Sequence, residues 1–139
     1  ITIDGDNQHD ASQINKIVES LKNYDVVFTI RNNFNRFSET LLSIIANFCY
    51  DIKDPLSGLK GYRKNILKFY KFKNWNQSFG SDILFFSKKN NFKIKGIKTK
   101  VKNRNDISRV GNTIKVNIKI LILSMSIFKT FVTDKIEIK

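Results

Sequence analysis

The first thirty residues carry the pattern that most constrains the fold. A short apolar run, Ile1–Ile3, ends in a polar loop at residues 4–10, and Ser12 then opens a segment whose apolar residues recur at helical spacing. Asp25–Ile30 follows as a continuous β-branched and aromatic run, which is typical of a buried strand. This order predicts a βαβ unit with a parallel sheet, in which the polar loop lies at the carboxyl end of the first strand.

The rest of the chain up to residue 112 continues the alternation of helices and strands. We expect helices at residues 38–50, 64–70 and 81–89 and a strand at residues 92–101. Pro55 is the only proline and predicts a tight turn, and Gly96 interrupts the alternation of the last strand and predicts a bulge. With no internal repeat and no low-complexity linker, residues 1–112 read as one α/β domain.

The final segment, residues 113–139, has a different pattern. Its polar residues form a narrow stripe on a helix, and apolar residues cover most of the remaining surface; the stripe consists of Lys115, Lys119, Ser126 and Lys129. The charge-free run Ile120–Phe128 is shorter than the roughly 20 residues that cross a bilayer. Two interpretations stay open, namely a helix in the membrane interface with its lysines toward the headgroups, and a helix packed on this protein or on a partner.

The charge and cysteine content narrow the class of protein only in part. The net charge of +13 suggests a polyanionic partner such as nucleic acid, anionic lipid or a phosphorylated substrate. The excess is mostly lysine, accompanied by much Asn, Ile and Phe, and codons rich in adenine and thymine produce the same composition. Cys49 is the only cysteine, so an intrachain disulfide is excluded and a reducing, cytoplasmic compartment is expected. Its apolar helical surroundings predict a small buried hydrophobe.

Three side chains with oxygen atoms alternate just beyond the first strand, in the order Asp4, Asp6 and Gln8. Carboxylate and amide oxygens are ligands for hard divalent cations such as Mg²⁺, and a cation between two carboxylates relieves their repulsion. A metal in this loop would bridge to a diphosphate and neutralise charge on a leaving group. The loop is not an EF-hand, because His9 occupies the position that requires glycine. Short motifs of this kind also cap helices and line turns.

ITIDGDNQHD resembles the metal-binding motif of dolichyl-phosphate mannose synthases and their bacterial polyprenyl-phosphate relatives in glycosyltransferase family 2. Further segments are similar to family motifs in the same order: Asp25–Arg31, Arg36, Asp54–Arg63, Asp82, Arg104 and Ser108. Asp82 stands where the family has Glu, and Asp106 stands where it has Gly. The resemblance implies a GT-A-like (Rossmann-like) mixed sheet with flanking helices. Residues 1–112 would be its C-terminal part, and the N-terminal half that holds the nucleotide would be missing.

The resemblance also implies a reaction and roles for the matched residues. The reaction is the inverting, metal-dependent transfer of a sugar from a nucleotide-sugar donor to a polyprenyl phosphate. It implies that the chain lies peripherally at the cytoplasmic face of a membrane. Asp4, Asp6 and Gln8 would hold Mg²⁺ or Mn²⁺, Arg31 and Arg36 would contact phosphates, and Arg104 and Ser108 would belong to a loop that closes over the substrates.

Three other functions compete with this one. A related family 2 transferase would pass the sugar to a saccharide hydroxyl and would need a carboxylate base, for which Asp82 is the candidate. A nucleic-acid-binding module would place aromatic residues among the lysines, as Phe92 and Lys93–Lys102 do faintly, and we do not expect nucleic acid as the partner. The chain would finally be an inactive remnant if it lacks the half that binds the nucleotide.

Overall fold

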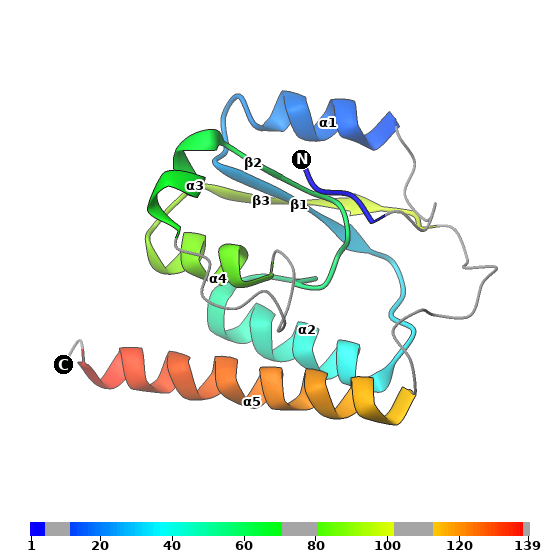
Figure 1. The fold of residues 1–139 in the computed structure, drawn as a ribbon, viewed down its shortest axis with the longest axis vertical. Coiled ribbons are helices and arrows are strands. Elements are labelled where there is room, and N and C mark those ends of the chain that lie inside the picture. Colours follow the sequence, from blue (N-terminus) through cyan, green and yellow to red (C-terminus); the bar gives the residue numbers. More distant parts are fainter. Residues whose placement is uncertain (5–11, 71–80, 102–112, 138–139) are drawn as a thin grey trace. The chain divides into compact units, whose positions relative to one another are not determined.

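A computed structural model describes residues 1–4, 12–70, 81–101 and 113–137 of the chain (Figure 1). The chain divides into two compact units, one formed by residues 1–32 and 56–104 and the other by residues 33–55 and 105–139. The first unit contains α1 (Ser12–Ser20), β1 (Val26–Arg31), β2 (Lys60–Tyr62), α3 (Lys64–Phe69), α4 (Ser81–Lys89) and β3 (Ile94–Thr99). The second contains α2 (Phe37–Tyr50) and α5 (Thr113–Glu137). The α/β class and the expected helices are confirmed.

The described sheet has the strand order β2-β1-β3 and is mixed. β1 pairs with β3 in parallel, from Val26 opposite Ile94 to Arg31 opposite Thr99, and it pairs with β2 in antiparallel fashion. On the outer side of β2, Thr2 forms an antiparallel bridge to Lys60, with backbone N–H···O distances of 2.8 and 3.0 Å. A mixed sheet with flanking helices therefore agrees with the expectation from the resemblance.

The predicted neighbour of the opening strand was wrong. The chain at Thr2 runs in the same direction as β1, as the βαβ pattern predicts, but β2 lies between the two segments instead of direct parallel pairing. β2 is only three residues long, Lys60–Tyr62, and contains a glycine, so it carries too little alternation to be recognised as a strand. The insertion of a strand from later in the chain depends on long-range packing. The local pattern of residues 1–30 therefore cannot predict it.

Helix α1 packs on the sheet directly above Gly61 of β2 (Figure 1). Its residue Ile17 is fully buried and forms a core cluster with Val27 and Leu59, against which Leu21 also packs. A Cβ atom at Gly61 would lie 2.4 Å from Cγ2 of Ile17 and 3.0 Å from Cδ1 of Leu21. The helix can approach the sheet this closely because residue 61 has no side chain.

We therefore expect Gly61→Ala to destabilise the protein by about 1–3 kcal/mol, since overpacking a filled core forces the neighbours to move. Urea unfolding followed by circular dichroism measures this loss. Asn65→Ala serves as the control, because Asn65 is exposed on α3 and its replacement should change stability by less than about 0.5 kcal/mol. An unchanged unfolding midpoint for Gly61→Ala would contradict the close packing of α1 on β2.

Gly96 does not mark a bulge, so that prediction was wrong. The parallel register between β1 and β3 continues without interruption through Gly96, which pairs with Phe28. A Cβ atom at position 96 would lie 2.6 Å from Cδ1 of Ile30 and 3.1 Å from Cζ of Phe28. The glycine leaves room for these two side chains of β1 and preserves the regular pairing.

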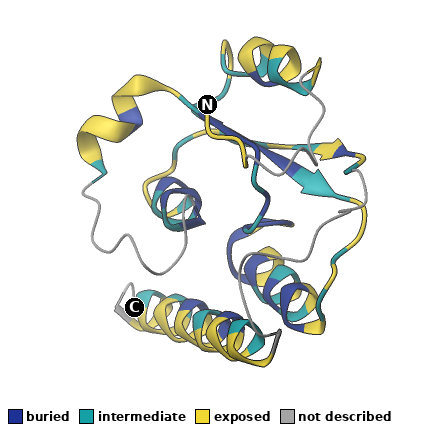
Figure 2. Ribbon diagram, turned by 45° about the vertical axis from the view of Figure 1, so that its right-hand side comes forward, coloured by how far each residue is buried: buried dark blue, intermediate teal, exposed yellow. Residues whose placement is uncertain are grey.

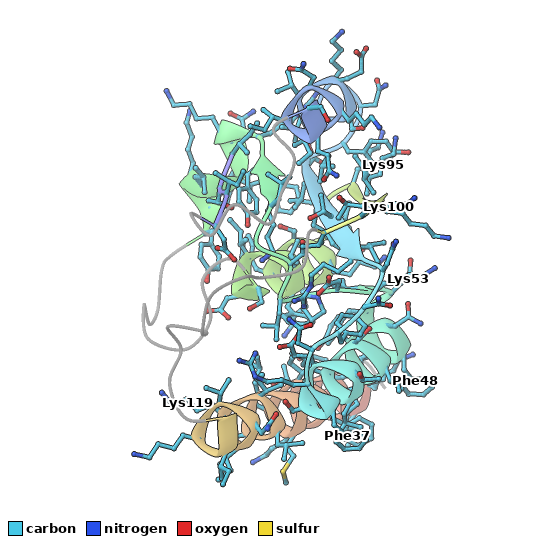
Figure 3. The ribbon with its side chains drawn as sticks, turned by 90° about the vertical axis from the view of Figure 1, so that its right-hand side faces the viewer. Phe37, Phe48, Lys53, Lys95, Lys100 and Lys119 are labelled. Atoms are coloured by element: carbon cyan, nitrogen blue, oxygen red, sulfur yellow. The ribbon has the colours of Figure 1, made fainter. Side chains whose placement is uncertain are left out.

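The predicted faces of β3 are confirmed within the described strand. Thr99 is buried and Ile97 is half-buried, whereas Lys98 and the neighbouring Lys100 are exposed. Lys95 lies over the ring of Tyr24, with Nζ 5.1 Å from the ring centroid, and Figure 3 labels Lys95 of β3 and Lys100, which follows the last residue of that strand. Because β3 is at the edge of the described sheet, these lysines have an ordinary structural role, which is to discourage pairing with a foreign strand.

In the second unit, α2 and α5 pack side by side and run in the same direction. Near their starts, the hydroxyl of Ser38 donates a hydrogen bond to Oδ1 of Asn117 at 2.5 Å. Near their ends, the rings of Tyr50 and Phe131 meet edge to face at 5.6 Å between centroids. Cys49 is buried in α2, as predicted, and burial raises the pKa of its thiol.

Candidate functional site

The structure describes four of the eight residues that the sequence singled out. Asp4, Arg31 and Asp82 belong to the first unit, and Arg36 belongs to the second. The others lie outside the described residues; they are Asp6, Gln8, Arg104 and Ser108. The candidate site therefore lies at the carboxyl ends of the strands, where Asp4 and Arg31 are found.

The carboxylate of Asp4 lies directly against Gly58. A Cβ atom at Gly58 would be 2.1 Å from Oδ2 and 2.4 Å from Cγ of Asp4, so the carboxylate occupies the space that any side chain at position 58 would need. Asp4 itself is exposed. The antiparallel bridge between Thr2 and Lys60 brings the two segments together. Asp4 follows Thr2 by two residues, and Gly58 precedes Lys60 by two residues, so the two meet across the bridge. The sequence places Gly58 in a turn and in the segment Asp54–Arg63 that resembles a family motif, and its contact with Asp4 is a finding of the structure.

Polar contacts from β1 hold the turn that carries Gly58. Thr29 is fully buried, and its hydroxyl shares a short hydrogen bond with the hydroxyl of Ser57, which is also fully buried. The backbone N–H and the hydroxyl of Thr29 both donate to the carbonyl of Leu59, each at 3.1 Å. The residues on both sides of Gly58 are thereby fixed to the central strand. No sequence pattern distinguishes Thr29 from the other residues of the predicted buried strand.

Arg31 lies at the carboxyl end of β1, on the same edge of the sheet as Asp4. It is half-buried and pairs in register with Thr99 of β3. The opening segment is separated from β1 by β2 alone, so the backbones of Asp4 and Arg31 are about two strand spacings, or roughly 10 Å, apart. Open α/β sheets bind ligands beyond this edge. The parallel direction of the two segments thus places the backbones of both residues at the same end of the sheet.

A buried lysine is a further cation near Asp4 that sequence reasoning missed. Lys60 is only 3% exposed and pairs in register with Thr2 on one side and Phe28 on the other. Lysine is rarely buried to this extent. Residues opposite each other in a sheet share a face, and the diagonal neighbours on that face are within reach of long side chains. Lys60 therefore starts from the same face as Thr2, beside the segment that carries Asp4.

Arg36 has a partner within its own helix. It precedes α2 as the N-cap residue, and its Nη1 atom lies 2.7 Å from Oε1 of Glu39. The side chain of Glu39 is 5% exposed and that of Arg36 is 19% exposed, so this is a largely buried ion pair. A buried carboxylate needs such a counter-charge. The observed contact supports a structural role for Arg36, and the phosphate contact stays a prediction.

Asp82 is in the first turn of α4, next to Tyr70. Burial and the negative charge of Asp82 both raise the pKa of Tyr70, with burial as the larger cause. The ring of Tyr70 packs edge to face on Phe86 at 5.2 Å between centroids. A carboxylate at a helix N-terminus is stabilised by the helix dipole, which is the ordinary reason for an acidic residue at this position. The role of Asp82 as a base stays a prediction.

Arg63, which ends the segment Asp54–Arg63, stabilises the end of α1. Its Nε atom donates to the carbonyl of Leu21 at 2.8 Å, and its Nη2 atom donates to the carbonyl of Lys22. Its Nη1 atom also lies 3.9 Å from the carboxylate of Asp25. These are carbonyls at the C-terminus of a helix, where a cation is favourable. Arg63 therefore stabilises the end of α1, and it lies at the opposite end of the sheet from Asp4.

The chemistry of Asp4 fits one ligand of a divalent cation, since its carboxylate is exposed and held at the edge of the sheet. Among the residues that the structure describes, no group of three or more His, Cys, Asp or Glu side chains could hold a metal ion. The other two proposed ligands, Asp6 and Gln8, are outside the described part of the chain. The three metal ligands therefore stay a prediction. Asp4 is the one of them that lies among the described residues.

Comparisons with protein families and with curated proteins found no relative of the chain: no protein-family model matches it, and no curated protein matches it.

Proposed function

We propose that this chain is the metal-binding and acceptor-facing part of a family 2 glycosyltransferase with a GT-A-like fold. The proposed reaction moves a sugar from a nucleotide-sugar donor to a polyprenyl phosphate. The observation that carries the proposal is the position of Asp4, whose carboxylate rests on Gly58 at the carboxyl edge of a mixed sheet. The order of motifs that resemble the family supplies the substrate class.

Each residue in the proposed site has a role that its chemistry supports. Asp4 would hold Mg²⁺ or Mn²⁺ together with Asp6 and Gln8, and the bound cation would neutralise charge on the diphosphate of the donor. Arg31 would orient a phosphate, because a guanidinium group matches phosphate oxygens in a bidentate way. An acceptor phosphate is already ionised at neutral pH, so positioning and charge neutralisation would supply most of the rate.

The proposal is tested by assaying sugar transfer with and without Mg²⁺ or Mn²⁺. Polyprenyl phosphate and an oligosaccharide are offered as alternative acceptors, with several nucleotide sugars as donors. The chain is assayed alone and within any longer reading frame that contains it. Metal-dependent glycosylation of the polyprenyl phosphate is the expected result. Transfer to the oligosaccharide alone would identify the other type of family 2 transferase, and tight metal-independent binding of oligonucleotides without transfer would overturn the proposal.

Gly58→Ala is expected to weaken binding of Mn²⁺ by about tenfold. A methyl group at this position cannot coexist with the present place of the Asp4 carboxylate, which must rotate away. Losing the geometry of one ligand corresponds to roughly 1.4 kcal/mol or more, since ligand orientation governs metal affinity. Titration of Mn²⁺ followed by electron paramagnetic resonance measures the change, with the thermal unfolding midpoint recorded in parallel.

Gly61→Ala is the matched control for this substitution, because it adds the same methyl group three residues away, under α1. It should lower stability while leaving the affinity of the folded protein for Mn²⁺ within about twofold. Equal Mn²⁺ affinity in Gly58→Ala and the wild type would separate Gly58 from the metal site.

A further inference from the structure

Helix α3 ends in an aromatic residue, Phe69, that is mostly exposed although it contacts a cluster of other rings. Phe69 is 66% exposed, and Figure 2 draws most of α3 as exposed. Its ring centroid lies 6.5 Å from that of Phe92, which lies 6.2 Å from that of Phe86 on α4. Tyr70 packs on Phe86 in turn, at 5.2 Å between centroids. The exposed ring is thereby held by its neighbours, so a ligand that stacks on it pays little to order it.

Lysines accompany the rings of this cluster. Each of the three phenylalanines has an exposed lysine within three positions along the chain; these lysines are Lys68, Lys89 and Lys93. The ring contacts bring together the end of α3, the end of α4 and the residues before β3, so the three lysines start from one region of the first unit. We call the following six residues the aromatic–lysine surface: Phe69, Phe86, Phe92, Lys68, Lys89 and Lys93.

The chain around the aromatic–lysine surface is poor in acidic residues. α3 contains none, and residues 83–101 contain none. The carboxylate of Asp25 accepts the backbone N–H of Lys93 at 2.9 Å, and it also lies 3.9 Å from Nη1 of Arg63. Asp82 is in the first turn of α4, whereas Lys89 is the last residue of that helix. The surface therefore combines an exposed ring with an excess of positive charge.

These two features together match the chemistry of an unpaired nucleotide. Bases stack on aromatic side chains, and lysines neutralise the phosphates between them. In a duplex the faces of the bases are covered by their neighbours, so an exposed ring gains less from it. An acidic peptide would satisfy the lysines but would offer no flat ring to Phe69. The sequence shows only Phe92 ahead of Lys93, and the fold adds Phe69 and Lys68 to them.

We propose that the aromatic–lysine surface binds single-stranded nucleic acid, with a base stacked on Phe69 and the adjoining phosphates held by the three lysines. The other two rings position Phe69. The surface lies beside the first residues of β3, whereas Asp4 and Arg31 lie at the carboxyl end of the sheet. It is therefore separate from the proposed catalytic residues, and the inference does not depend on the sugar-transfer reaction.

The test is fluorescence anisotropy of labelled oligo-dT and oligo-U of about twelve nucleotides, titrated with the whole chain. Phe69→Leu should weaken binding at least about fivefold, because it keeps an apolar side chain and removes the stacking face. Phe69→Trp should bind as tightly as the wild type or more tightly. Phe37→Leu is the matched control, since Phe37 is 80% exposed on α2, and its affinity should stay within about twofold. Circular dichroism of each variant verifies that it is folded.

The lysines are tested through the salt dependence of binding. Lys68→Gln/Lys93→Gln should make the slope of log K against log salt concentration shallower by roughly 1.4, because each phosphate contact to a single strand contributes about 0.7. Lys115→Gln/Lys119→Gln removes the same charge from α5 and should leave the slope unchanged.

Four results would overturn the proposal. The first is a wild-type chain that binds neither oligonucleotide, and the second is wild-type affinity in Phe69→Leu. The third is competition by polyglutamate as effective as that by an unlabelled oligonucleotide of equal charge, which would show that charge acts without stacking. The fourth is loss of binding to anionic vesicles in Phe69→Leu with unchanged oligonucleotide binding, which would assign the surface to lipid.

Discussion

Asp4→Asn and Asp6→Asn are each expected to reduce metal-dependent sugar transfer by two or more orders of magnitude. Removing one charged ligand weakens the hold on the cation and leaves the diphosphate charge poorly neutralised, and a loss of about 3–4 kcal/mol in transition-state stabilisation corresponds to this factor. Asp4 is exposed at the edge of the sheet, so its replacement by the isosteric amide should leave the fold intact. Initial rates measured across a range of Mn²⁺ concentrations report the effect.

Asp51→Asn is the control for the charge change. Asp51 is the C-cap residue of α2 with φ 55° and ψ 41°, a left-handed conformation that Asn adopts readily. Its transfer rate and Mn²⁺ affinity should match the wild type within about twofold. If Asp6→Asn kept the wild-type rate and still required metal, Asp6 would be removed from the site, and the same result for Asp4 would remove the structural support for the proposed reaction.

Arg36→Ala is expected to destabilise the protein by about 3 kcal/mol. The substitution leaves the carboxylate of Glu39, which is 5% exposed, without the guanidinium that lies 2.7 Å away. Removing one partner of a buried ion pair typically costs about 3–5 kcal/mol, and the partial exposure of Arg36 favours the lower end of that range. Urea unfolding at neutral pH measures the loss.

The double variant Arg36→Ala/Glu39→Gln separates the ion pair from other roles of Arg36. With the buried charge removed, at least half of the lost stability should return. A single variant as stable as the wild type would show that the pair contributes nothing to folding, and Arg36 would then be better explained by the phosphate contact that the resemblance implies. Transfer rates are compared only under conditions in which each variant is folded.

Most of the helices and strands can be recognised in the amino-acid sequence, because the patterns that indicate them are local. The periodicity of apolar residues predicted α2, α4 and the buried strand β1, and alternation predicted the buried and exposed faces of β3. It also predicted that Cys49 is buried. For the site, the sequence identified Asp4 at the end of the opening strand and Arg31 at the end of β1, and both lie at the carboxyl edge of the sheet.

Which of these elements become neighbours depends on long-range contacts in the folded chain. Three contacts join residues more than forty positions apart: β2 pairs with Thr2, Asp4 lies against Gly58, and Arg63 binds the end of α1. The prediction of a bulge at Gly96 is wrong, because the glycine makes room for two side chains of another strand, which the local sequence does not reveal. α5 likewise reads from its sequence as one broadly apolar helix, and the packing on α2 divides it into a buried and an exposed face. Local patterns cannot contain such information, because long-range contacts depend on which surfaces fit together once the chain has folded.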